Sequence, residues 1–566
     1  MTSVIGAQVF ETHYHQIGVA TYGNMINVPV VKLLKTFCGA IAMHPVHWLS
    51  RNPVGYKRIV SLVLTLCVGG MTLLGWSAPV QARESMPATS IQPYLDQVAS
   101  RVKEFTLDNG MKFLVLERRQ APVVSFMLYA NVGAVNEADG ETGVAHYLEH
   151  LAFKGTTRIG TQNYAAEKQV LDEMDAVFDQ ILAAEQAGQL EQAERLQAQL
   201  DTLREEAVRY IEQNEYGRII NQAGGVGLNA TTGAEATRYF YSLPSNKLEL
   251  WMSLESERFL EPVFREFYEE KDIILEERRL RVDNDPIGQL IEVFLESAFE
   301  KHPYRRPVIG YQEDLYTATR ERIQRFFDTY YGPSNLIAVI VGDVDPANVQ
   351  RMAEAYFGRF VARSLPAEVI IEEPQQTAPK EFTLSLQSQP WYLEGYHRPS
   401  INHPDHPVYG LIEGILVSGR TSRLYKDLVE DRQIALDVGS INGFPGDKYP
   451  TMLLLYGLTA PGYTPDDIAS LMQQQLERLT TEGIATEELD RVKTQARAAL
   501  LRRLDSNSGM AALLADYEAK TGSWRNVFAE LEAIEAVTPD DIQRVAEATF
   551  RPENRTVGKI IPAEDS

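Results

Sequence analysis

Cysteine is almost absent from this chain of 566 residues, and its two cysteines, Cys38 and Cys67, both lie near the N-terminus. If that leading segment is removed, the remaining protein has no disulfide, no thiolate metal ligand and no cysteine nucleophile. Any metal must then be held by histidines and carboxylates. Histidine is scarce as well, with ten residues in the chain, so chance seldom places histidines at a ligand spacing.

A basic surface is also missing. The net charge is −23, and residues 1–82 contain five basic residues and one acidic residue, so the acidic excess lies in the rest of the chain. No basic patch with interleaved aromatic residues occurs, which argues against nucleic-acid binding. The contents of 44% apolar and 23% charged residues are typical of a soluble globular protein. The length predicts two to four domains.

The leader, residues 1–82, has the pattern of an export signal. Basic residues precede the uncharged, mostly apolar run 59–76, and small residues occupy the −3 and −1 positions of a cut after Ala82. This pattern predicts an exported, periplasmic protein. The run is also just long enough to span a bilayer, so an uncleaved membrane tether stays open. Because the segment before the run is unusually long, a start at Met43 is an alternative to Met1.

The stretch Gly143–Gly155 contains the pattern H-x-x-E-H. In a helix, His146 and His150 lie one turn apart on the same face, with Glu149 beside them. Two neutral imidazoles suit Zn²⁺, and a carboxylate beside the metal can accept a proton from the metal's water. The pattern is the inverse of H-E-x-x-H and is a metalloprotease signature. The alternative is a chance arrangement on an ordinary amphipathic helix.

The patterns around this motif predict α+β layers. Residues 105–107 and 111–116 are expected to be strands joined by an Asn-Gly turn, and 123–132 a third strand before the metal helix, which favours an antiparallel sheet. Residues 165–213, rich in Glu, Gln, Ala and Leu, predict a helical hairpin. The glycine-rich stretch 224–232 lacks the Gly-Lys-Ser/Thr ending of a phosphate loop and fits better as the entry to a strand.

An internal repeat divides the chain. Ile323-Gln324-Arg325 with Pro333 and Asn335 recurs as Ile542-Gln543-Arg544 with Pro552 and Asn554, and the metal helix recurs around Glu413 with glycines in place of both histidines. The two copies of the metal helix lie about 45 residues farther apart in the sequence than the two copies of Ile-Gln-Arg do. The first copy therefore has about 45 extra residues between these landmarks, and the helical hairpin is expected to be an insertion there. We therefore predict a leader at 1–82, linkers at 83–100 and 362–380, and related domains at 101–361 and 381–566.

These residues resemble the pitrilysin (M16) family of zinc peptidases, the inverzincins. The resemblance extends from Val102 to Pro562 and rests on Leu107-Asp108-Asn109-Gly110, the helix from His146 to Gly155, Asn229-Ala230-Thr231, Glu270 to Pro286, His302-Pro303-Tyr304, Tyr331-Gly332-Pro333-Ser334-Asn335 and Ser422-Arg423-Leu424-Tyr425. It implies two tandem α+β halves, each a roughly six-stranded antiparallel sheet with helices, which close like a clam.

The resemblance also implies the remaining site residues. Glu277 matches the third ligand of one zinc ion per chain, with its neighbour Glu276 as the rival, and Glu270 matches a carboxylate that orients a ligand histidine. Asn229 matches a residue beside the sheet edge at which an extended peptide adds as a strand. Glu149 is then the general base that takes a proton from the zinc-activated water and passes it to the leaving amine.

The implied function is a zinc endopeptidase acting on peptides or unfolded polypeptides. Self-sufficient relatives carry an arginine and a tyrosine in the second half, where this sequence has Val429 and Leu436. We therefore expect a heterodimer with a metal-free M16-like subunit that supplies both residues, or otherwise a homodimer. One alternative function is a non-proteolytic assembly or binding subunit of the same fold. Another is a membrane-anchored adaptor built on the hairpin.

Overall fold

The computed structural model of the chain describes residues 92–563. The predicted leader 1–82, its apolar run 59–76 and the start of the linker 83–100 lie outside the described residues. The end of that linker differs from the prediction, because residues Gln92–Arg101 form helix α4. Leu95 and Val98 are buried on one side of this helix, since residues three apart share a face. No helix in the described range has the length and apolar character needed to cross a membrane.

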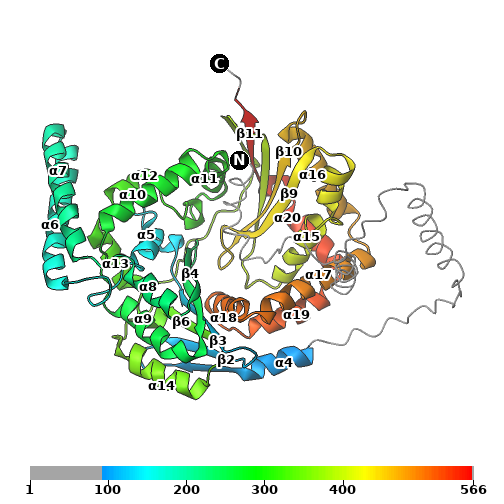
Figure 1. The fold of residues 1–566 in the computed structure, drawn as a ribbon. Helices are drawn as coiled ribbons and strands as arrows, with labels where there is room; N and C mark the ends of the chain where they lie inside the picture. Colours follow the sequence, from blue (N-terminus) through cyan, green and yellow to red (C-terminus); the bar gives the residue numbers. More distant parts are fainter. Residues whose placement is uncertain (1–91, 564–566) are drawn as a thin grey trace, which may run out of the picture. The chain divides into compact units, whose positions relative to one another are not determined.

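The first half contains a six-stranded sheet with the strand order β1-β2-β6-β3-β5-β4. Figure 1 labels β2, β3, β4 and β6 among these strands. Its strands are β1 (Val102–Thr106), β2 (Lys112–Glu117), β3 (Val123–Ala130), β4 (Val226–Thr232), β5 (Thr237–Pro244) and β6 (Leu336–Gly342). All neighbouring strands are antiparallel except β2 and β6. A parallel pair needs a long crossover connection, which the helices and strands between β2 and β6 supply. The glycine-rich stretch is itself the edge strand β4.

The second half repeats this topology in a five-stranded sheet with the order β7-β11-β8-β10-β9. Its strands are β7 (Lys380–Leu386), β8 (Trp391–Arg398), β9 (Ala435–Phe444), β10 (Thr451–Thr459) and β11 (Arg555–Pro562). β7 and β11 are parallel and the other pairs antiparallel, so the order and directions match those of β2-β6-β3-β5-β4. The predicted α+β fold of two related halves is confirmed, with one parallel pair in each sheet that the prediction missed.

Helices surround both sheets. The first half contains α5 (Val144–Leu151), α6 (Tyr164–Gln186), α7 (Leu190–Ala207), α8 (Glu215–Gln222), α9 (Leu248–Leu260), α10 (Phe267–Arg278), α11 (Pro286–Ala298), α12 (Gln312–Thr317), α13 (Arg320–Tyr330) and α14 (Pro346–Tyr356). The second contains α15 (His406–Leu416), α16 (Pro465–Thr481), α17 (Thr486–Asp505), α18 (Asn507–Thr521), α19 (Asn526–Ala536) and α20 (Pro539–Thr549). The predicted helical hairpin is α6 and α7, joined at Gly188, whose φ is +70°.

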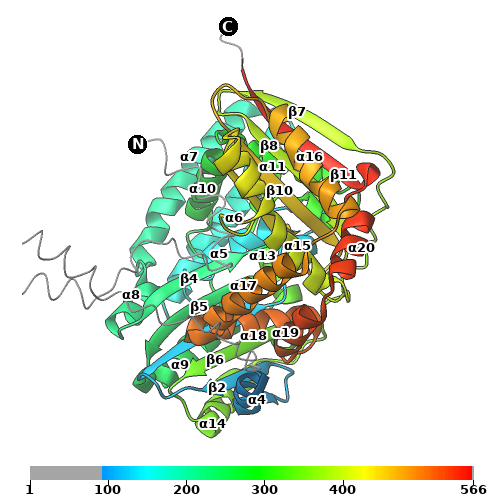
Figure 2. The same ribbon diagram turned by 90° about the vertical axis from the view of Figure 1, so that its right-hand side faces the viewer.

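Each sheet is covered on one face by a helix from the other half of the chain. α18 packs against β3 and β6 of the first sheet, and Figure 2 shows it in front of that sheet. α11 packs against β7 and β11 of the second sheet. Leu290 and Phe294 of α11 share a core with Leu393 and Met452. Packing therefore crosses between the predicted domains 101–361 and 381–566. These bounds divide the sequence into its two related halves, but each half also contributes a helix to the sheet of the other. Residues 361–379, at the predicted linker, contain neither helix nor strand.

The internal repeat has the same local structure in both copies. Each copy is a helix, a 3₁₀ turn and a strand: α13, Pro333–Asn335 and β6 in one, α20, Pro552–Asn554 and β11 in the other. Asn335 donates from Nδ2 to the carbonyl oxygens of Tyr330 and Asn131, and Asn554 donates in the same way to those of Thr549 and His397. The repeated asparagine thus closes the helix end and ties it to a strand.

Candidate metal centre

Helix α5 carries the H-x-x-E-H pattern and begins at a tight turn. Gly143, which precedes the helix, has a φ of +84°, and a Cβ there would lie 2.6 Å from the carbonyl oxygen of Ile309. The buried carboxylate of Glu137 accepts hydrogen bonds from the backbone N–H groups of Gly143 (3.0 Å) and Ala145 (2.8 Å). It satisfies donors that a helix N-terminus leaves open. Sequence reasoning missed Glu137, because no local pattern links it to the helix that follows.

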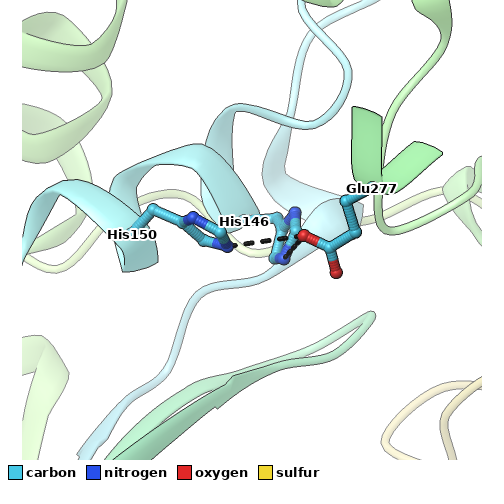
Figure 3. A group of neighbouring side chains, drawn as sticks. All are labelled: His146, His150 and Glu277. Carbon is cyan, nitrogen blue, oxygen red and sulfur yellow. Dashed lines mark ion pairs between the residues drawn. The ribbon is translucent and has the colours of Figure 1, made fainter. Parts of the chain in front are cut away.

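The structure brings the two histidines of α5 together with Glu277 of α10 (Figure 3). Oε2 of Glu277 lies 3.6 Å from Nε2 of His150 and 3.9 Å from Nε2 of His146. Among the described residues, this is the group of histidines and carboxylates whose ligand atoms all lie within 4.8 Å of one another. Three such donors are the number that a catalytic zinc site takes from the protein.

The donor spacing fits a zinc ion. In a tetrahedral site with bonds near 2.1 Å, neighbouring donor atoms lie about 3.4 Å apart, slightly less than the separations found here. Nδ1 of His146 is buried and has no hydrogen-bond partner among the described residues. Burial, followed by the positive charges of His150 and Arg281, lowers the pKa of His146 to about 3. Its imidazole is therefore neutral, which is the form that binds a metal.

Helix phase separates Glu277 from its rival Glu276. Glu276 is exposed and its carboxylate pairs with Arg279 one turn later. Glu277 faces α5 instead, and its second oxygen, Oε1, lies 2.8 Å from Nη1 of Arg281. Arg281 thus forms an ion pair with the carboxylate oxygen of Glu277 that does not face the histidines. Sequence reasoning did not identify Arg281, although its position four residues after Glu277 on a helical pattern is a usable signal.

Glu270, two turns before Glu277 on α10, contacts the back of His150. Its Oε2 lies 2.9 Å from Nδ1 of His150, and its Oε1 lies 2.6 Å from Nζ of Lys154. Burial alone would raise the pKa of Glu270, but the hydrogen bonds and positive charges of His150 and Lys154 outweigh it, so the pKa is lowered. The ionised carboxylate holds Nδ1–H of His150, which leaves Nε2 free to face Glu277.

Glu149 lies on α5 beside the histidines and contacts the edge strand β4. Its Oε2 accepts a hydrogen bond from Oγ1 of Thr232. Burial raises the pKa of Glu149, although the Thr232 hydrogen bond and the charge of His150 oppose this. Thr232 was not identified from the sequence, where it is one of two adjacent threonines with no distinguishing spacing.

Asn229 does not join this group. It lies on β4 opposite Phe240 of β5, and its side chain is exposed. Because side chains alternate along a strand, Asn229 faces away from the side on which Thr232 meets Glu149. Its predicted role in substrate binding stays a prediction.

Comparisons with known proteins identify the kind of domains that this chain contains. Residues 113–177, which include α5, match the family described as "Insulinase (Peptidase family M16)". Residues 317–496 match "Peptidase M16 inactive domain". The chain therefore contains M16 peptidase family domains in both halves of its sequence. The M16 match in the first half covers the histidines, and the inactive-domain match covers Gly410 and Gly414 in the second.

Proteins similar to this chain are named as proteases. The chain is 28% identical over 461 residues to "Zinc protease PqqE" of Helicobacter pylori, across 79% of this chain and 88% of that protein. A crystal structure of a protease from Helicobacter pylori aligns with a TM-score of 0.69 and 25% identity, covering 81% of this chain and 99% of that one. The periplasmic protease PqqL of Escherichia coli shares the fold, with a TM-score of 0.61 and 16% identity, over 81% of this chain and 47% of that one.

Proposed function

We propose that the chain is a zinc-dependent endopeptidase that hydrolyses peptides or unfolded polypeptides. The observation that carries the proposal is the convergence of His146, His150 and Glu277 beside Glu149. The names of the M16 relatives, which include zinc proteases, support the same class of reaction. One zinc ion per chain is expected, because the second copy of the metal helix has glycines in place of the histidines.

A zinc ion held by these three residues would polarise the scissile carbonyl and lower the pKa of a water molecule beside it. Glu149 takes the proton of that water at Oε1, because Thr232 already donates to Oε2. The same carboxyl group then gives the proton to the nitrogen of the leaving amine. Glu270 and Arg281 keep His150 and Glu277 in place while this happens.

The edge strand β4 is the proposed place for the substrate. In the described residues it pairs with β5 on one side, while its other side has no strand partner. An extended peptide that adds to this edge gains main-chain hydrogen bonds with little dependence on sequence. Exposed Asn229 would lie along it, and Thr232 links the strand to Glu149.

Metal analysis and cleavage of a peptide library test the proposal together. The purified chain should contain about one zinc per molecule, and together with the expected metal-free partner it should cleave unstructured peptides. A chelator should abolish cleavage and added zinc should restore it. Full cleavage after complete metal removal contradicts the zinc mechanism. Zinc binding without cleavage of any peptide, with or without a partner, favours the non-proteolytic binding subunit instead.

We further propose that the active enzyme has two chains, with a metal-free M16-like partner that supplies an arginine and a tyrosine. The absence of that pair at Val429 and Leu436 supports this. The partner should raise the turnover of the purified chain and form a complex with it in light scattering. Full turnover by the chain alone, as a monomer or a homodimer, contradicts the proposal.

Export to the periplasm is proposed from the leader alone. Mass spectrometry of the mature N-terminus should find Arg83 as the first residue, and fractionation should place the protein in the periplasm. A membrane-bound protein that retains residues 59–76 would instead be tethered.

A further inference from the structure

The hairpin of α6 and α7 lies in the sequence between the two halves of the metal centre, after His150 and before Glu277. In space it lies beside α10, the helix that carries Glu270 and Glu277 (Figure 1). α10 contacts α5 with the face that bears these glutamates. Its other face meets the hairpin, so α10 is held between the metal helix and the inserted hairpin.

Apolar and aromatic contacts form the inner part of this interface. Phe178 of α6 packs against Tyr268 with ring centroids 5.2 Å apart, and Nζ of Lys271 lies 3.9 Å from the centre of the Phe178 ring. Lys271 also donates to the carbonyl oxygens of Tyr316 and Ala318. The hairpin belongs to the first core through residues of both helices: Val170, Leu171, Met174, Val177, Phe178, Ile181, Leu200, Leu203 and Ala207.

Ion pairs form the outer part. Arg204 of α7 donates from Nε to Glu269 and from Nη2 to Asp272, each at 2.8 Å. These carboxylates lie one residue before and two residues after Glu270. Residues one or two positions from Glu270 lie on a different face of the helix from Glu270 itself. Arg204 therefore binds α10 on the face away from the metal centre. Tyr268 adds a hydrogen bond to Asp175 of α6 at 3.1 Å.

The start of the hairpin is bonded to the segments that flank the metal centre, the loop after α5 and the start of α10. Arg265, just before α10, pairs with Glu167 in the first turn of α6, and both side chains are fully buried. Arg265 also donates to the carbonyl oxygens of Lys154, Thr156 and Ile159 in the loop that follows α5. The hairpin, that loop and the start of α10 therefore share one buried charge pair.

We propose that the inserted hairpin is a brace that holds α10 at the rotation that points Glu270 and Glu277 toward α5, with Arg204 as a positioning residue. A turn of α10 by one residue would present Glu276 in place of Glu277, since successive residues on a helix are about 100° apart. The inference rests on the proposed zinc function only where its test measures zinc affinity.

The test compares Arg204→Ala with Arg195→Ala, a matched control on the same helix. Arg195 is exposed and has no ion pair among the described residues. Zinc affinity is measured by competition with a chelator, well below the melting temperature, so that a loss of global stability alone does not change it. Arg204→Ala should weaken zinc binding about threefold to tenfold, because its two ion pairs with α10 are lost. Arg195→Ala should leave it unchanged, and Arg204→Lys should restore part of it.

A double-mutant cycle and a metal-free measurement complete the design. Glu269→Gln with Asp272→Asn should weaken zinc binding as much as Arg204→Ala, and adding Arg204→Ala should have no further effect. In the apo protein, Arg204→Ala should speed hydrogen exchange in α10 more than in α9. Unchanged zinc affinity and unchanged exchange in Arg204→Ala overturn the brace. If the parent chain binds no zinc, the proposed function fails, whereas the exchange result still decides the brace.

Discussion

Helices α5 and α15 occupy equivalent places on two sheets of the same topology, yet of the two only α5 carries histidines that cluster with Glu277. Glu149 of α5 accepts a hydrogen bond from Thr232 on the edge strand β4. Glu413 of α15 accepts one from Ser440 on β9, the corresponding edge strand, at 2.8 Å. The contact between carboxylate and hydroxyl is thus common to both halves. A buried carboxylate needs a donor wherever it occurs, so this contact by itself does not mark catalysis.

The helix that packs on each copy makes the difference. A Cβ on Gly414, the counterpart of His150, would lie 2.4 Å from Cγ1 of Val492 on α17. A histidine has no room there. On α5 the neighbouring helix is α10, which brings Glu270 and Glu277 to the histidines. One scaffold therefore supports either a polar centre or an apolar contact, depending on a few side chains of the packed helix.

The test with the largest expected effect substitutes His150 and Gly414, one of the two pairs of residues that distinguish the copies. His150→Ala should weaken zinc binding at least about a hundredfold and abolish peptide cleavage, because a metal ligand is lost. Gly414→Ala should keep both, but lower the free energy of unfolding by about 1–3 kcal/mol through overpacking against Val492. Zinc titration and denaturant unfolding measure these effects. Unchanged zinc affinity in His150→Ala would show that the metal binds elsewhere.

Substitution of the paired glutamates Glu149 and Glu413 tests whether the first carboxylate acts in catalysis and the second only in structure. Glu149→Gln should lower kcat about 10²–10⁴-fold while zinc stays bound, because the proton acceptor is gone. Glu413→Gln keeps the shape and an acceptor for Ser440, so activity should not change. Rates of peptide cleavage and zinc content are the measurements. An equal loss of activity in both variants would mean that the two halves do not differ in this role.

Two carboxylates of α10, Glu270 and Glu276, provide a further test with a smaller expected effect on zinc binding. Glu270→Gln should weaken zinc binding about 10–100-fold, because His150 loses the charged acceptor at Nδ1. Glu276→Gln serves as the control, since Glu276 is exposed and pairs only with Arg279 in the described structure. Chelator competition measures both. Equal effects of the two substitutions would contradict the helix phase described above.

The smallest expected effect concerns the two hydroxyls. Thr232→Ala should lower kcat about tenfold, since Glu149 loses the donor that fixes its Oε2. Ser440→Ala should change only the free energy of unfolding. Steady-state kinetics of the two variants distinguish these outcomes, and wild-type kinetics in Thr232→Ala would make its contact purely structural.

Much of the fold follows from patterns within short segments. The α+β order, the helical hairpin and the repeat ending in Asn335 and Asn554 were predictable, because strand and helix periodicity and the repeat can be read directly from neighbouring residues. The exchange of α11 and α18 between the sheets was not predictable. Both helices carry apolar residues that could cover either sheet. The sequence around each helix contains no pattern that indicates which sheet it packs on.

The site divides in the same way. His146, Glu149 and His150 share one helical face by spacing alone, so the motif contains half of the centre within five residues. The choice of Glu277 over Glu276, the contact of Glu270 with a histidine 120 residues earlier, and the contacts of Glu137, Thr232 and Arg281 depend on how distant elements pack. A one-residue difference in helix rotation decides which glutamate faces the histidines, and only tertiary packing sets that rotation.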